Sequence, residues 1–152
     1  MNVILRKMTL DDVQQVIAID QISFSLPWPV SSFRYELTEN LASRCWVAEL
    51  DGRVAAMLVA WFIVDEIHIA TIATHPDFRK QGVGEKLLLH TLQSAKAEGA
   101  VSSFLEVREG NDAAIMMYRK LGYVESGRRA GYYKDNGEDA ILMNLEPLNI
   151  EV

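Results

Sequence analysis

Residues 67–89 read IHIATIATHPDFRKQGVGEKLLL, and this stretch decides the fold because it predicts a strand, a turn and a helix in succession. The run from Ile67 to Ala73 is apolar and rich in β-branched side chains, which favour a strand. Pro76 cannot donate a hydrogen bond to a sheet and therefore marks the end of that strand. A loop that contains glycine follows at once.

Gly82 and Gly84 lack a Cβ atom, so the chain can turn tightly between the strand and a helix that we expect to begin near Val83. The positive end of that helix and the N–H groups of the loop can approach an anionic ligand. A dinucleotide-binding loop would need a third glycine, and a Walker loop would need Gly-Lys-Ser/Thr. The pattern therefore predicts a phosphate-binding loop of another kind, with a plain glycine turn as the alternative.

The segment Arg79–Gly84 (RKQGVG) fits the pattern Arg/Gln-x-x-Gly-x-Gly/Ala, and in this loop the chain resembles the Gcn5-related N-acetyltransferases (GNAT superfamily). Residues 104–123, FLEVREGNDAAIMMYRKLGY, resemble the second half of that fold. With Pro27-Trp28 and the tail from Tyr132 to Ile141, the similarity spans nearly the whole chain. It is greatest to the RimI-type enzymes, which acetylate the N-terminal alanine of a small-subunit ribosomal protein.

The composition is that of an ordinary globular protein. The chain has 152 residues, with 49% hydrophobic and 24% charged, so we expect one N-acetyltransferase domain over residues 1–152. No apolar run approaches the ~20 residues that a membrane helix needs, and Arg6 and Lys7 precede acidic residues instead of the apolar core of a secretory signal. We therefore expect a cytoplasmic protein that does not bind membranes.

The net charge of -6 argues against direct, nonspecific binding to nucleic acid and suits a basic polypeptide substrate. Cys45 is the single cysteine, so the chain has no internal disulfide and no sequence pattern for a metal site. The oligomeric state stays open between a monomer and a homodimer.

Local patterns place the other elements. Thr9, Ser31 or Ser32, and Asn111 or Asp112 are expected to open helices, the last of which ends at Gly122. Strands are expected at Val3–Lys7, Cys45–Leu50, Arg53–Val64, Val101–Val107 and in a final hairpin within residues 124–145 that turns at Asn136-Gly137. The Asp51-Gly52 pair suits a hairpin turn, and a further turn is expected at Asp65-Glu66.

This order of elements predicts an α+β fold built on one mixed sheet. The resemblance implies a GNAT-like, mostly antiparallel sheet of about seven strands with helices on both faces. It also implies that the strands of Ile72 and Glu106 part at the centre of the sheet, and that the pantetheine arm of acetyl-CoA lies in the opening.

The resemblance implies which residues bind acetyl-CoA, with no metal. The pyrophosphate would accept hydrogen bonds from the backbone of Gln81, Gly82, Val83, Gly84 and Glu85, and Arg79 and Lys80 could add positive charge. Glu85 stands where RimI-type sequences often carry arginine, which brings a negative side chain near the phosphates.

The main chain of Ile72, Ala73 and Thr74 would hold pantetheine and direct an N–H group at the thioester oxygen, as in an oxyanion hole. Asn111 resembles the residue that hydrogen-bonds the pantetheine arm. It could equally cap the helix that follows, and both roles can hold together.

Two residues are candidates for proton transfer. Glu106 lies in an otherwise apolar strand, so its carboxylate either points to solvent or is held for catalysis; by resemblance it is the general base. Tyr118 either packs on the sheet or, as the resemblance implies, is the general acid that protonates the leaving thiolate of CoA.

Aromatic residues that resemble the loops beside the peptide-entry groove of RimI-type enzymes are Trp28, Tyr132 and Tyr133, although burial under loops would also explain them. The expected activity is acetyl transfer to a protein N-terminal amine, with a ribosomal protein as the expected acceptor. Acetylation of lysine side chains, polyamines or other small amines is the alternative, and a non-catalytic sensor of acyl-CoA is a third reading.

Overall fold

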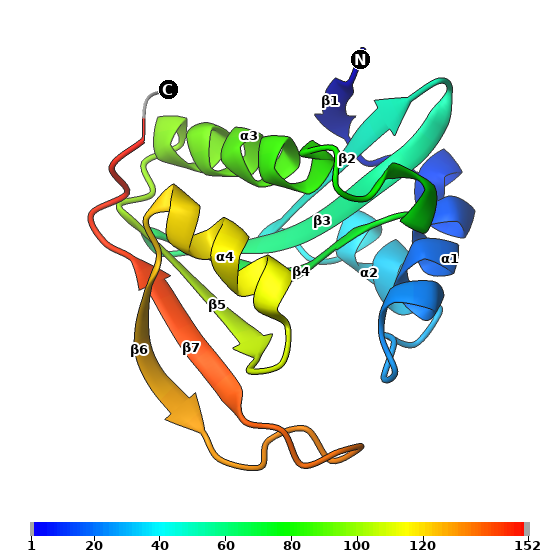
Figure 1. The fold of residues 1–152 in the computed structure, drawn as a ribbon. Coiled ribbons are helices and arrows are strands. Elements are labelled where there is room, and N and C mark those ends of the chain that lie inside the picture. The colour runs from blue at the N-terminus through cyan, green and yellow to red at the C-terminus, as the bar shows by residue number, and fades with distance from the viewer. Residues whose placement is uncertain (1, 151–152) are drawn as a thin grey trace. The chain divides into compact units, whose positions relative to one another are not determined.

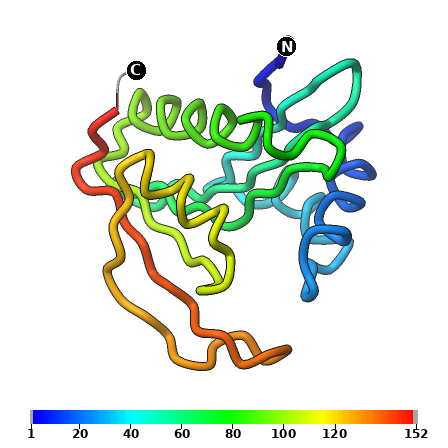
Figure 2. Tube along the Cα trace, viewed as in Figure 1, coloured from blue at the N-terminus to red at the C-terminus, as the bar shows by residue number. Residues whose placement is uncertain are grey.

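The computed structural model describes residues 2–150, and Figures 1 and 2 trace the chain. Contacts group it into two compact units. The first contains Met1–Trp61 and Ala70–Thr91, and the second contains Phe62–Ile69 and Leu92–Val152.

Seven strands form one hydrogen-bonded sheet in the order β1-β2-β3-β4-β5-β7-β6. They are β1 Ile4–Lys7, β2 Ser43–Leu50, β3 Arg53–Ile63, β4 Glu66–Thr74, β5 Ser102–Arg108, β6 Val124–Arg129 and β7 Ala140–Leu145. The α-helices are α1 Val13–Ser23, α2 Ser32–Thr38, α3 Val83–Ala97 and α4 Asp112–Leu121, with short 3-10 turns at Leu10–Asp12 and Pro76–Phe78. The pair β4–β5 is parallel, whereas β1–β2, β2–β3, β5–β7 and β6–β7 are antiparallel. This confirms the predicted α+β fold with a mixed, mostly antiparallel sheet.

In the first unit, helices cover both faces of the β2–β3 hairpin. Val47 of β2 and Met57 of β3 are paired neighbours and join a buried cluster with α1 and α2. Trp46 points to the opposite face, because successive side chains of a strand alternate. Its ring meets that of His90 on α3 edge-on at 4.7 Å. Every residue of β3 from Val54 to Ala60 is consequently buried.

The hairpin turn is the predicted one. Asp51 and Gly52 have φ values of 54° and 76°, and Leu50 pairs with Arg53. Two positive φ angles define the turn that matches the twist of paired strands, and an Asp-Gly pair adopts it readily.

The turn between β3 and β4 differs from the prediction by one residue. It consists of Val64 and Asp65, because Glu66 already belongs to β4. Val64 has a φ of 59°, which is unfavourable for a β-branched residue. The polar pair Asp65-Glu66 was thus a misleading turn signal.

In the second unit, β5 lies between the first half of β4 and β7. Residues Glu66–Ile69 pair with Ser102–Leu105, and Ser103–Arg108 pair with Ala140–Leu145. Helix α4 follows β5 and ends at Gly122, whose φ of 109° suits glycine. The last hairpin closes through the ten-residue loop 130–139. Its turn covers residues 134–136, closed by the N–H of Gly137 to the carbonyl of Tyr133 at 2.8 Å, and so begins two residues before the predicted Asn136-Gly137 pair.

None of the helices within residues 2–150 is long and apolar enough to span a membrane.

Candidate active site

In the first unit, the predicted phosphate loop joins the end of β4 to α3. Lys80 and Gly82 both have positive φ, 63° and 78°, and α3 begins at Val83 as predicted. The N–H of Lys86 donates to the carbonyl of Gly82 at 3.1 Å, which is the first hydrogen bond of the helix. N–H groups at the start of a helix point toward the position that an anion would occupy.

The residues whose backbone was predicted to bind pyrophosphate are therefore consecutive in this loop and first turn: Gln81, Gly82, Val83, Gly84 and Glu85. Gly84 lies inside α3, so the tight turn belongs to Gly82. Glu85 is half-buried, and Lys80 is exposed.

Arg79 contacts the protein itself. Its Nε donates to the carbonyl of Thr74 at 2.9 Å, and its Nη2 donates to Oγ of Ser23 at 3.2 Å. The guanidinium thus fixes the loop to the end of β4 and to α1, a role that the sequence did not suggest.

The main chain of Ile72, Ala73 and Thr74 forms the last part of β4, beyond the residues described as paired with β5. The N–H of His75 donates to the carbonyl of Ala55 at 2.8 Å, which anchors the end of the strand to β3. This segment is held extended, as contact with a ligand along its backbone would require.

In the second unit, Tyr118 lies on the buried face of α4. Its side chain is almost completely buried, and its ring lies 5.8 Å from that of Tyr123. Burial, and secondly the phenol of Tyr133, raises the pKa of Tyr118 well above its usual value, so the hydroxyl is protonated at neutral pH. Within residues 2–150, this hydroxyl has no described hydrogen-bond partner, whereas that of Tyr123 is bonded to Oγ of Ser103 at 2.6 Å.

Glu106 lies on β5 with its carboxylate accessible. The side chain is 34% exposed, and its Oε1 lies 3.3 Å from Nε of Arg129 on β6. The sequence left open whether this carboxylate points to solvent or is held for catalysis, and the structure shows that it is accessible and ion-paired. Arg129 holds its orientation, and its role as general base remains a prediction.

Asn111 is the N-cap of α4. Its Oδ1 accepts a hydrogen bond from the N–H of Ala114 at 3.3 Å, and the residue is exposed. The structural role predicted for Asn111 is confirmed, and its contact with pantetheine remains a prediction.

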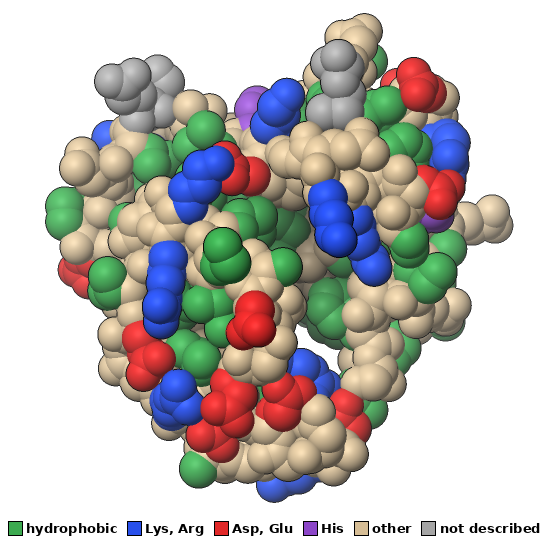
Figure 3. Space-filling view, in the orientation of Figure 1, with side chains coloured by type: hydrophobic (Ala, Val, Ile, Leu, Met, Phe, Trp, Pro, Cys, Tyr) green, Lys and Arg blue, Asp and Glu red, His purple; other side chains and the backbone are tan. Residues whose placement is uncertain are grey.

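Tyr132 and Tyr133 lie in the β6–β7 loop, with their rings 5.2 Å apart and nearly perpendicular. Arg108 of β5 lies over the ring of Tyr133 at 3.9 Å and forms a two-pronged ion pair with Asp135 of the same loop at 2.9 and 3.0 Å. Figure 3 shows acidic side chains gathered where Figure 1 draws this end of the hairpin. Arg108 thus fastens the loop to the sheet.

Tyr133 connects the two catalytic candidates electrostatically. Burial raises the pKa of Tyr133, and the charge of Glu106 raises it further. Tyr133 in turn raises the pKa of Tyr118. All three residues belong to the second unit.

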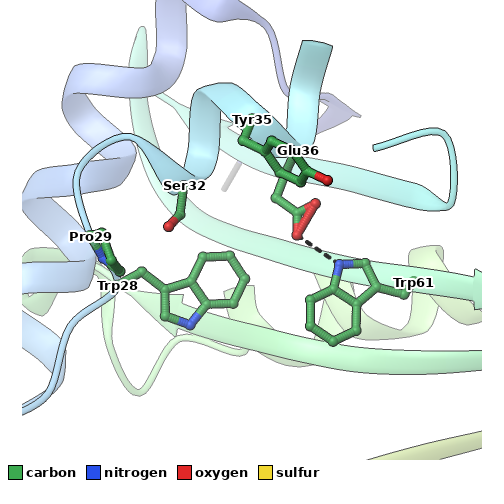
Figure 4. Close-up of a pocket in the computed structure, with 6 residues that line it drawn as sticks. All are labelled: Trp28, Pro29, Ser32, Tyr35, Glu36 and Trp61. Carbon is green, nitrogen blue, oxygen red and sulfur yellow. Dashed lines mark hydrogen bonds between the residues drawn. The ribbon is translucent and has the colours of Figure 1, made fainter. Parts of the chain in front are cut away.

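Trp28, the other aromatic candidate, belongs to the first unit. Its ring stacks on Phe33 of α2 at 5.1 Å and lies 6.5 Å from the ring of Trp61 at the end of β3. It is one wall of a pocket on this unit (Figure 4).

Sequence reasoning missed Arg108, Arg129 and Glu36. The two arginines act across strands or on a loop far along the chain, and no local pattern announces such partners. Glu36 did leave a signal, because it shares one face of α2 with Phe33 and Leu37, three residues before and one residue after it.

Comparisons with known proteins agree with this geometry. The model of the acetyltransferase (GNAT) family matches residues 13–123. A Bacillus subtilis (strain 168) protein, provisionally assigned as a ribosomal protein bS18-alanine N-acetyltransferase, is 39% identical over 139 residues, 91% of this chain and 92% of that protein. The ribosomal protein bS18-alanine N-acetyltransferase of Escherichia coli (strain K12) is 32% identical over 145 residues, 88% of this chain and 90% of that protein.

The crystal structure of the Escherichia coli ribosomal-protein-S18-alanine N-acetyltransferase superposes with a TM-score of 0.88 at 30% identity, and the match covers 96% of this chain and 94% of that chain. The sequence motifs, the sheet order and these likenesses lead to the same conclusion. The chain belongs to the acetyltransferase (GNAT) family.

Proposed function

We propose that the chain works as one N-acetyltransferase domain that transfers the acetyl group of acetyl-CoA to the N-terminal α-amine of a protein. A ribosomal protein is the proposed acceptor, and the cytoplasm is the proposed place of the reaction. Support comes from the relatives above, which are named ribosomal protein bS18-alanine N-acetyltransferases, the first provisionally. The family match, which includes residues of both units, supports it further.

The reaction needs a base and an acid. Glu106 removes a proton from the α-ammonium group, directly or through water, and the freed nitrogen attacks the carbonyl carbon of the thioester. When the tetrahedral intermediate collapses, the C–S bond breaks and Tyr118 gives its proton to the departing thiolate. The acetylated nitrogen loses its second proton, which restores the phenol of Tyr118 through solvent. A carboxylate base removes a proton more readily from an α-ammonium group with pKa ~7.7–8.0 than from a lysine ammonium group with pKa ~10.4.

The observation that carries this assignment is the Tyr118 hydroxyl, which is protonated and lacks a described partner within residues 2–150. A phenol that donates to no described side chain or carbonyl can donate its proton to a ligand atom, here the sulfur of CoA.

The test is acetylation of a panel of peptides with free N-termini, beside peptides whose only amine is a lysine side chain, read by mass spectrometry. Glu106→Gln should lower turnover of an accepted peptide ~10²- to 10⁴-fold near pH 7, with acetyl-CoA binding kept. Glu109→Gln is the matched control, because Glu109 is an exposed carboxylate that pairs with Arg128. Full activity of the Glu106 variant, or equal losses in both variants, would contradict the assignment.

A further inference from the structure

A pocket of about 330 Å³ opens on the first unit, where the chain leaves α1 and enters α2 (Figure 4). Its lining is mainly aromatic, with one carboxylate. The lining residues are Trp28, Pro29, Ser32, Tyr35, Glu36 and Trp61.

Two indole rings give the pocket a flat apolar wall. The rings of Trp28 and Trp61 are nearly parallel, with an angle of 13° between their planes and centroids 6.5 Å apart, and Figure 4 shows them side by side. Phe33 stacks behind Trp28 and holds it in place. Faces of indole rings attract cations more strongly than those of other aromatic side chains.

Glu36 is the charged group of this pocket, and it is buried, with only 7% of the residue exposed. Its Oε1 accepts a hydrogen bond from Nε1 of Trp61 at 2.8 Å. Its Oε2 accepts hydrogen bonds from Nδ2 of Asn40 at 2.7 Å and from Oγ of Ser43 at 3.1 Å.

All three donors to Glu36 are neutral. Among residues 2–150, no described ion pair includes this carboxylate, although a buried charge is normally compensated by an opposite one. A carboxylate can accept about four hydrogen bonds, so Glu36 retains capacity for one more donor. The pocket therefore combines an aromatic wall with a carboxylate that three neutral donors hold in place and that pairs with no described cation of residues 2–150.

We propose that this pocket binds a basic side chain of the acceptor polypeptide, with arginine preferred. An arginine guanidinium can stack on an indole and donate to a carboxylate at the same time, which a lysine ammonium does less well. The inference rests on the proposed function, because it assigns the pocket to the protein substrate. It would add recognition of the sequence that follows the reactive amine.

Charge complementarity supports a polypeptide occupant of this kind. The chain carries a net charge of -6, and the acceptor named for its relatives is a ribosomal protein. A protein that binds RNA needs lysine and arginine to neutralise phosphates. A neutral aromatic or aliphatic side chain would bury the carboxylate of Glu36 against an apolar surface at a cost.

The experiment measures binding without catalysis. Peptides that begin with alanine carry one arginine at positions 2 to 6 in turn, and each is paired with a peptide in which citrulline, the neutral isostere, replaces it. Binding in the absence of acetyl-CoA is followed by calorimetry for the parent chain and for Glu36→Gln. Glu39→Gln is the control, because it removes the same charge from an exposed position at the end of α2.

At one position, the parent should bind the arginine peptide about ten-fold more tightly than its citrulline partner. The ratio should fall to about one for Glu36→Gln and persist for Glu39→Gln. If Glu36→Gln does not fold, Trp61→Phe replaces it. This variant keeps the carboxylate of Glu36 but removes the Nε1 donor and makes the aromatic wall smaller. It should lower the arginine-to-citrulline ratio about three-fold.

A ratio near one at every position in the parent would overturn the proposal, and so would an unchanged ratio in Glu36→Gln or, where that variant does not fold, in Trp61→Phe. Preference for a leucine or phenylalanine peptide over the arginine peptide would show an apolar occupant instead. A failure of the proposed function is distinguishable, because it would appear as absent acetylation of every peptide while the arginine ratio still depends on Glu36.

Discussion

Replacing Tyr123 by phenylalanine should destabilise the protein and leave catalysis intact. The same change at Tyr118 should leave the stability nearly unchanged and impair catalysis. The two residues suit a matched comparison because both are buried tyrosines and their rings lie 5.8 Å apart. They differ in the partner of the hydroxyl group.

The hydroxyl of Tyr123 is bonded to Oγ of Ser103 at 2.6 Å, and both residues are buried. Tyr123→Phe leaves the serine hydroxyl buried without this partner, which costs about 1–3 kcal/mol of unfolding free energy. For a domain of this size, about 2–4 °C is lost per kcal/mol, so the melting temperature should fall by roughly 2–12 °C. Turnover well below that temperature should stay within about two-fold of the parent, because Tyr123 is assigned no role in the chemistry.

Tyr118→Phe removes a hydroxyl with no described partner within residues 2–150, so the unfolding free energy should change by no more than about 0.5 kcal/mol. Turnover should fall ~10²- to 10⁴-fold if the phenol protonates the leaving thiolate. The loss should shrink with a thioester whose thiol is more acidic, because a better leaving group needs less help.

The assay pairs thermal unfolding of the two variants with single-turnover kinetics on both thioesters. The reasoning is refuted if Tyr118→Phe is destabilised as much as Tyr123→Phe, which would indicate a structural hydroxyl. Unchanged turnover of Tyr118→Phe with acetyl-CoA, or equal losses with both thioesters, would also refute it.

Three further changes test the loop and the buried carboxylates. Acetyl-CoA should raise the melting temperature of the parent but not of Gly84→Asp, because the new side chain places negative charge in the first turn of α3; an equal shift in both would contradict the phosphate assignment. Burial raises the pKa of Asp20, although its Oδ2 accepts from the N–H of Trp28 at 2.9 Å. The folded parent therefore loses stability as the pH rises above the pKa that Asp20 has in the unfolded chain. At pH 7 the melting temperature of Asp20→Asn should be higher than that of the parent, and this difference should shrink toward pH ~4. The Arg6 guanidinium lowers the pKa of Asp12. The free energy of unfolding of the parent should therefore be about 1–3 kcal/mol larger than that of Asp12→Asn at pH 7. Chemical denaturation should show this difference fading below pH ~4, as the carboxylate of the parent is protonated.

Much of the fold was predictable because its boundaries depend on neighbouring residues. The Asp51-Gly52 pair adopts its turn through its own backbone preferences, and Asn111 and Gly122 begin and end α4 through contacts within a few residues. The turn at Val64 was placed one residue late, since its conformation goes against the preference of a β-branched residue.

The candidate site was predictable in its residues and less so in their surroundings. Alternation along β5 could not decide whether Glu106 faces solvent, because that depends on Arg129 of another strand. Arg79 could be read as a phosphate ligand, since its contact with Ser23, 56 residues away in the sequence, forms only when distant segments meet. Local sequence patterns do not predict hydrogen bonds and ion pairs between side chains that are far apart in the sequence.

The burial of β3 on both faces has a consequence for biosynthesis. The strand emerges as the apolar run VAAMLVAWFI at residues 54–63, and α1 and α2, which cover one face, have been synthesised before it. The other face waits for α3, which ends at Ala97. At about 5–20 residues per second, this face of the nascent chain stays bare for roughly 2–7 seconds. During that interval the hairpin is a site for chaperone capture or for aggregation between neighbouring ribosomes, so slower translation of residues 64–97 should lower the yield of folded protein.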